Sequence, residues 1–176
     1  MTQTAALLFQ ERTLDELEID DEASFHHIAL YRDLKQILRD TNYRFRLLPE
    51  AQAGRWDHAL LLNLTYWQAT SGGDVLMDGR LDADVVTHVA WHHLASAALA
   101  DSAAPPSADA LILGEAIASA FEVYLVGRLI GNAPESSFLE TQVPAMADAA
   151  DAAGLPEAAF QALLEDVARE PERAFE

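Results

Sequence analysis

Two histidines, His88 and His92, lie four residues apart in the segment 84–94, which reads Asp-Val-Val-Thr-His-Val-Ala-Trp-His-His-Leu. Residues at this spacing share one face of an α-helix, with their Cβ atoms roughly 6 Å apart. Two imidazoles placed in this way can reach one metal ion. A carboxylate from a neighbouring helix would supply a third ligand, so the pair predicts half of a metal site.

The helix expected around these histidines is apolar over most of its surface. With about 100° of rotation per residue, Asp84 and His92 lie within about 40° of His88 and share one stripe with it. Such a helix is usually buried, and buried imidazoles need partners for both ring nitrogens. A metal ion is one such partner, and a carboxylate or a backbone carbonyl is another. The apolar residues on the rest of the circumference include Val85, Val86, Val89, Trp91 and Leu94.

The next expected helix, residues 107–131, carries two glutamates on an inward stripe. Glu115, Ser119 and Glu122 fall within about 60° of one another on the helical wheel. Two buried carboxylates would be costly unless they were paired or bound to metal. Because Glu115 and Glu122 are about 10.5 Å apart along the helix axis, we expect one of them to ligate the ion and the other to support a ligand.

Apolar periodicity predicts that a single compact all-α domain positions these residues. About six helices are expected over the 176 residues, and the last two, within 136–170, form a more peripheral layer. Residues 43–48 alternate as a short strand would, but six residues alone cannot make a sheet. Helical periods and end signals place the six helices at about 24–40, 55–70, 82–100, 107–131, 136–153 (interrupted by Pro144) and 156–170.

Composition excludes several classes of function. The chain has no cysteine, so its metal ligands must be His, Asp or Glu. Its 11 basic and 29 acidic residues give a net charge of -18, the opposite of the basic footprint of a nucleic-acid binder, and an anionic membrane would repel it. The most apolar stretch, 110–129, is interrupted by Glu115, Glu122 and Arg128. We therefore predict a cytoplasmic protein without a nucleic-acid or membrane partner, and leave self-association open.

The segment 86–94 resembles the active-site helix of the zincin metallopeptidases, in which two histidines bracket a turn and a glutamate follows the first. The later segment 113–121, Leu-Gly-Glu-Ala-Ile-Ala-Ser-Ala-Phe, resembles the downstream glutamate helix of the gluzincin branch. The resemblance covers about residues 82–128. It implies that His88, His92 and Glu115 bind zinc or another divalent ion, with water in the open position.

The chain departs from this family at Val89, which stands where the general base should be. Valine cannot accept a proton from zinc-bound water, a transfer commonly worth about 10²–10⁴-fold in rate. Glu122 and Asp84 are the candidate replacements, although neither holds the family position. The sheet with which zincins bind a peptide backbone is not evident either. The resemblance thus implies a metal site more strongly than peptidase activity: a metal-assisted hydrolase of a small molecule or peptide, or an inactive relative.

The same residues permit a non-enzymatic interpretation. His88 and His92 would then pair with Glu115 and Glu122 in a buried network that fixes helix register, in a scaffold or a partner-binding protein. A carboxylate-bridged dimetal bundle would need Glu-x-x-His pairs on two helices, and the chain has none. His93 lies about 140° from His88 on the wheel, so we expect it to be a core or surface residue and not a ligand.

Overall fold

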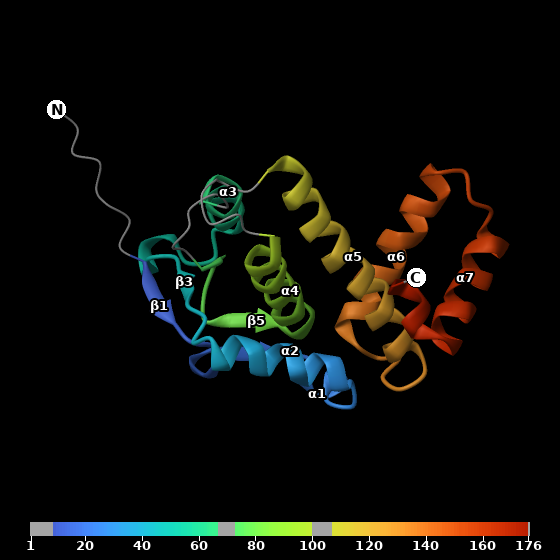
Figure 1. The fold of residues 1–176 in the computed structure, drawn as a ribbon, viewed down its shortest axis with the longest axis horizontal. Helices are drawn as coiled ribbons and strands as arrows, with labels where there is room; N and C mark the ends of the chain where they lie inside the picture. Colours follow the sequence, from blue (N-terminus) through green and yellow to red (C-terminus); the bar gives the residue numbers. More distant parts are fainter. Residues whose placement is uncertain (1–8, 67–72, 100–106, 176) are drawn as a thin grey trace.

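The computed structural model describes residues 9–66, 73–99 and 107–175. Seven α-helices carry most of these residues, and the strands among them are only two or three residues long (Figure 1). The prediction of a mostly all-α domain is therefore confirmed.

Two short helices replace the single helix expected at 24–40. They are α1 (Glu22–Phe25) and α2 (Ala29–Asp40), and the backbone of Ile28 between them is extended, with φ -85° and ψ 112°. The break buries both Phe25 and Ile28 in the main core. On α2, core residues then recur at helical spacing, which keeps its opposite face in solvent: Tyr31, Leu34 and Leu38.

Two small sheets join the N-terminal residues to the middle of the chain. In the first, β1 (Gln10–Arg12) pairs antiparallel with β3 (Phe45–Leu47), which pairs parallel with β4 (Val75–Leu76). In the second, β2 (Glu18–Asp20) runs parallel to β5 (Arg80–Asp82). The alternation of residues 43–48 predicted extended chain near β3. Strand β5 ends directly before residue 83, where α4 begins.

Helices α4 (Ala83–Leu99) and α5 (Ala108–Ile130) form the centre of the fold (Figure 1), and α3 (Trp56–Tyr66) packs against β4. Ser107 caps α5, because its side chain accepts a hydrogen bond from the backbone N–H of Ala110. The side chains that α4 and α5 bury together in the main core include Val86, Val89, Ala90, Phe121, Leu125 and Leu129.

Helices α6 (Ser137–Ala152) and α7 (Glu157–Arg169) follow, and a three-ten turn, Pro171–Phe175, packs against α5. The sequence predicted that Pro144 would interrupt the helix at 136–153, but α6 continues through it. Proline has no N–H and leaves the carbonyl of Glu140 without its helical partner. Both residues are exposed, so water can satisfy that carbonyl.

Among the described helices, length and composition alone would allow α5 to cross a membrane, a test that the core helix of a soluble protein also passes. In this structure α5 packs against α4, α6, α7 and the C-terminal turn. It also carries the two glutamates that face the histidines of α4.

Candidate metal site

Three potential ligand atoms converge where α4 meets α5. Nε2 of His92 lies 3.0 Å from Nε2 of His88 and 3.2 Å from Oε1 of Glu115. Nε2 of His88 lies 4.0 Å from Oε2 of Glu115, and the ligand atoms of the group all lie within 4.8 Å of one another. In a tetrahedral zinc site with bonds of about 2.0–2.1 Å, neighbouring donors are about 3.3 Å apart. The group could therefore hold a metal ion.

Helix geometry explains why these side chains meet. The four-residue spacing places the rings of His88 and His92 on one face of α4, with centroids 4.7 Å apart. Gly114, beside Glu115, is buried against α4: a Cβ there would lie 3.7 Å from the Cβ of Ala95 and 3.9 Å from Nδ1 of His92. A small residue at this position lets α5 approach the histidine face closely.

Glu122 lies at the other edge of the His88 ring. Its Oε1 is 3.1 Å from Nδ1 of His88, and its Oε2 accepts a 3.2 Å hydrogen bond from the side-chain amide of Gln142 on α6. Metal-binding histidines almost always donate their second N–H to a carboxylate, a carbonyl or water. Glu122 therefore lies where it can orient the ring, on the side away from Glu115. Gln142 could not be predicted from the sequence, because only tertiary packing brings α6 next to Glu122.

The two imidazoles have pKa values shifted in opposite directions. The hydrogen bond that His88 donates to the carboxylate of Glu122 raises the pKa of His88, in spite of its burial, and the charges of Glu122, Glu115 and Asp74 act in the same direction. Burial and the neighbouring His88 lower the pKa of His92. Adjacent imidazoles disfavour a second positive charge, so the two shifts favour protonation of His88 over protonation of His92.

Asp84 lies one turn before His88 on α4. Burial raises its pKa to about 6, and the charges of Asp82 and Glu122 add to this shift. A carboxyl group with such a pKa can exchange a proton near neutral pH. Of the two catalytic candidates from the sequence, Asp84 thus has the suitable pKa, while Glu122 is engaged with the ring of His88.

Val89 is buried in the main hydrophobic core. The position that would carry the zincin base therefore serves packing in this chain. Trp91 is partly buried against the same core, with its ring 5.6 Å from that of Phe121. His93 makes an edge-on contact of 5.4 Å with the ring of Tyr43, so it lies off the face shared by His88 and His92.

Asp74 is a neighbour that sequence reasoning missed. It directly precedes β4, and its carboxylate accepts a 2.6 Å hydrogen bond from the hydroxyl of Tyr43. Its charge acts to raise the pKa values of both His88 and His92. In the sequence Asp74 only marks the end of a Ser-Gly-Gly turn. The pairing of β3 with β4 determines where Asp74 lies relative to α4.

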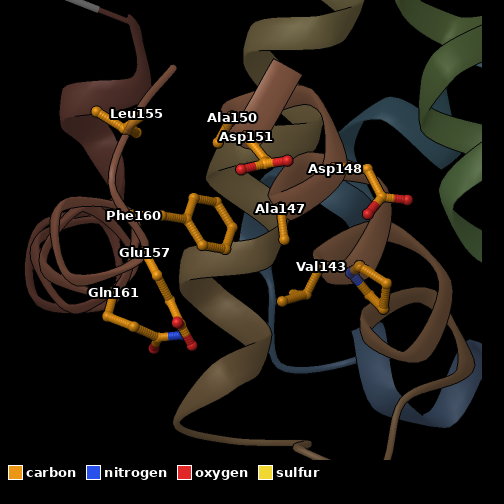
Figure 2. Close-up of a pocket in the computed structure, with 10 residues that line it drawn as sticks. Val143, Ala147, Asp148, Ala150, Asp151, Leu155, Glu157, Phe160 and Gln161 are labelled. Carbon is orange, nitrogen blue, oxygen red and sulfur yellow. The ribbon is translucent and has the colours of Figure 1, made fainter. Parts of the chain in front are cut away.

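The three ligand candidates remain accessible. The side chains of His88, His92 and Glu115 are 34%, 19% and 45% exposed, so water or a small ligand can reach them. A separate pocket of about 410 Å³ lies between α6 and α7 (Figure 2). Its lining combines apolar side chains with carboxylates and includes none of the three: Val143, Pro144, Ala147, Asp148, Ala150, Asp151, Leu155, Glu157, Phe160 and Gln161.

Comparison of the chain with protein-family models, with curated proteins and with solved structures finds no match in any of the three.

Proposed function

We propose that this protein binds a divalent metal ion, zinc in the first place, through His88, His92 and Glu115. One observation carries the proposal: three donor atoms converge within 4.8 Å while Glu122 holds the remaining nitrogen of His88. Ligand convergence and a carboxylate behind a ligating histidine are two separate features of metal sites. Their coincidence on two adjacent helices favours metal binding over chance proximity.

The types of ligand favour zinc. Imidazole and carboxylate groups suit zinc, and two histidines with one glutamate is a ligand set of catalytic zinc sites that keep a fourth position open. The partial exposure of Glu115 and His88 is consistent with an open position. The resemblance of residues 82–128 to the gluzincin helices points to the same ligand set.

Hydrolysis is the chemistry that such a centre would supply. A zinc ion lowers the pKa of bound water and polarises a carbonyl group. With Val89 in the core, the proton acceptor must come from elsewhere, and we assign this role to Asp84, with its pKa of about 6. Metal binding is thus the primary proposal, and metal-assisted hydrolysis is the activity that it would support.

A structural network is the second candidate, and the geometry gives it a specific basis. Nδ1–H of His88 can donate to Glu122, while Nε2–H of His92 is shared between Glu115 and Nε2 of His88. All these contacts are then satisfied by neutral imidazoles without an ion. In that case the histidines would join α4 to α5 and bind nothing.

Metal titration of the full-length, untagged chain separates the two candidates. After treatment with a chelator, zinc binding is followed by calorimetry, and unfolding is followed with and without zinc. We expect equimolar zinc in the wild type and in His26→Ala, whose histidine is exposed in the turn after α1. His88→Ala and His92→Ala should lose zinc and change the stability of the apo protein little. A wild type that neither binds zinc nor is stabilised by it, with both variants unstable as apo proteins, would overturn the proposal.

A further inference from the structure

The charged side chains around the metal group are almost all carboxylates. Glu115 faces His88 and His92 from α5, and Glu122 contacts the other edge of His88. Asp84 precedes the pair on α4, and its own environment includes the charge of Glu122. From α6 the contact is the neutral amide of Gln142. The helices that build the group therefore surround it with negative charge.

A fourth carboxylate comes from outside these helices. Asp74 precedes β4 and is fixed by the hydroxyl of Tyr43, whose ring packs against His93 on α4. The field of Asp74 reaches both histidines of the group. Tyr43 therefore holds the carboxylate of Asp74 in place beside α4.

Positive side chains are missing from the segment that forms the group. Residues 81–99 and 107–127 contain no lysine or arginine. The two flanking arginines are engaged elsewhere: Arg80 pairs with Asp20, and Arg128 contacts Tyr124 and Glu172. Arg128 is the one lysine or arginine on α4 and α5, and its contacts with Tyr124 and Glu172 leave a negatively charged ligand at the group no cationic partner on these helices besides the ion itself.

We propose that the metal group accepts uncharged or positively charged ligands and rejects anionic ones, and that Asp74 is a specificity-determining residue in this selection. The inference rests on the proposed metal site. Four carboxylates outweigh the two positive charges of a divalent ion, so the net field at the open position repels anions. The substrate class that follows is a neutral or basic amide or ester, and phosphate esters and carboxylates are disfavoured.

The test uses the full-length chain loaded with cobalt(II), whose visible spectrum reports on the coordination of the ion. Imidazole serves as the neutral probe, and azide and phosphate serve as anionic probes, at constant ionic strength. We expect imidazole to change the spectrum at concentrations about tenfold lower than either anion. Asp74→Asn, which keeps an oxygen for Tyr43, should tighten anion binding about fivefold and leave imidazole binding unchanged. Asp151→Asn removes the same charge from the distant pocket between α6 and α7 and is the matched control.

The possible results distinguish a failure of the charge selection from a failure of the metal site itself. A cobalt spectrum that depends on His88 and His92, together with phosphate binding as tight as imidazole binding, keeps the metal site but overturns the selection. Equal effects of Asp74→Asn and Asp151→Asn would show that only overall charge matters, and Asp74 would lose its role. If no cobalt spectrum depends on the two histidines, the metal site and the inference both fail.

Discussion

Nδ1 of His88 lies 3.1 Å from Oε1 of Glu122, at the ring edge away from His92 and Glu115. Since Gln142 on α6 holds the other oxygen of that carboxylate, three helices together determine how the ring is turned. The ring orientation is therefore set by the fold, and an ion would meet a ligand that is already aligned.

Replacing Glu122 with glutamine tests this alignment. The Glu122→Gln variant keeps an oxygen that can accept from Nδ1–H of His88 but loses the negative charge that makes the imidazole a stronger ligand. We expect zinc affinity to fall about tenfold, at the lower end of the range for such supporting groups, as measured by competition with a chromophoric chelator. Glu165→Gln, at an exposed position on α7, should bind zinc as the wild type does. An unchanged affinity in Glu122→Gln would remove Glu122 from the site.

The raised pKa of Asp84 predicts how the free energy of unfolding depends on pH. Burial raises its folded-state pKa to about 6, above the value of about 3.9 expected in the unfolded chain. Between these values the folded state binds more protons, so the free energy of unfolding falls as the pH rises from about 4 to 6. A shift of about two pKa units corresponds to about 3 kcal/mol, and because the carboxylate is only half-buried, solvent screening reduces its cost at pH 7.5 to about 1–2 kcal/mol.

The Asp84→Asn variant should remove the cost of burying an ionised carboxylate at this position. We expect its apo form to be more stable than the wild type by about 1 kcal/mol at pH 7.5 and nearly equal to it at pH 4, in urea unfolding at both pH values. Asp33→Asn, on the exposed face of α2, provides the control for loss of a carboxylate. A variant that is equally or less stable at pH 7.5 would contradict the raised pKa.

Gly127 provides a test of the packing between α5 and α7. A Cβ at this position would lie 2.4 Å from the carbonyl oxygen of Val167 and 2.8 Å from its Cγ1, so Gly127→Ala forces the helices apart. We expect a loss of about 2 kcal/mol in the free energy of unfolding. Gly131→Ala, one turn later, has open space around the new methyl group and no positive φ, and should change stability by about 0.5 kcal/mol or less. Equal effects in thermal unfolding would mean that α7 does not pack on Gly127.

Asp21 caps α6 from the opposite end of the chain. Its Oδ2 accepts hydrogen bonds from the hydroxyl of Ser136, at 2.6 Å, and from the backbone N–H of Ser137, at 3.0 Å. Its backbone is left-handed, with φ 54°, which glycine and asparagine tolerate. We expect Asp21→Gly to lose about 2 kcal/mol of stability although it relieves the backbone, and Asp21→Asn to lose less. Chemical denaturation measures both, and a more stable glycine variant would show that the cap contributes little.

Local patterns explain which parts of the fold could be predicted. The bounds of α4 and α5 follow from long apolar helices with polar residues at their starts, and the shared face of His88 and His92 follows from spacing within one helix. The break at Ile28 could not be read from periodicity, because it depends on a core that receives both Phe25 and Ile28. Strands β1, β2 and β5 are three residues long, and their hydrogen-bonding partners lie far along the chain.

The surroundings of the site were harder to predict than its ligand candidates. Glu115 and Glu122 share a stripe on one helix, so the wheel could place them. Gln142 reaches Glu122 from α6, and Asp74 reaches the histidines through the packing of β4. No sequence spacing encodes these tertiary contacts.

The connections made by residues 18–21 have a consequence for the order of folding. Asp20 binds Arg80 across 60 residues, and Asp21 binds Ser136 across 115, whereas α4 and α5 are neighbours in the chain. Contacts between residues close in sequence cost less loop-closure entropy and tend to form early. The helical hairpin with its histidines and glutamates is therefore expected to assemble first, and the N-terminal strands to close over it late.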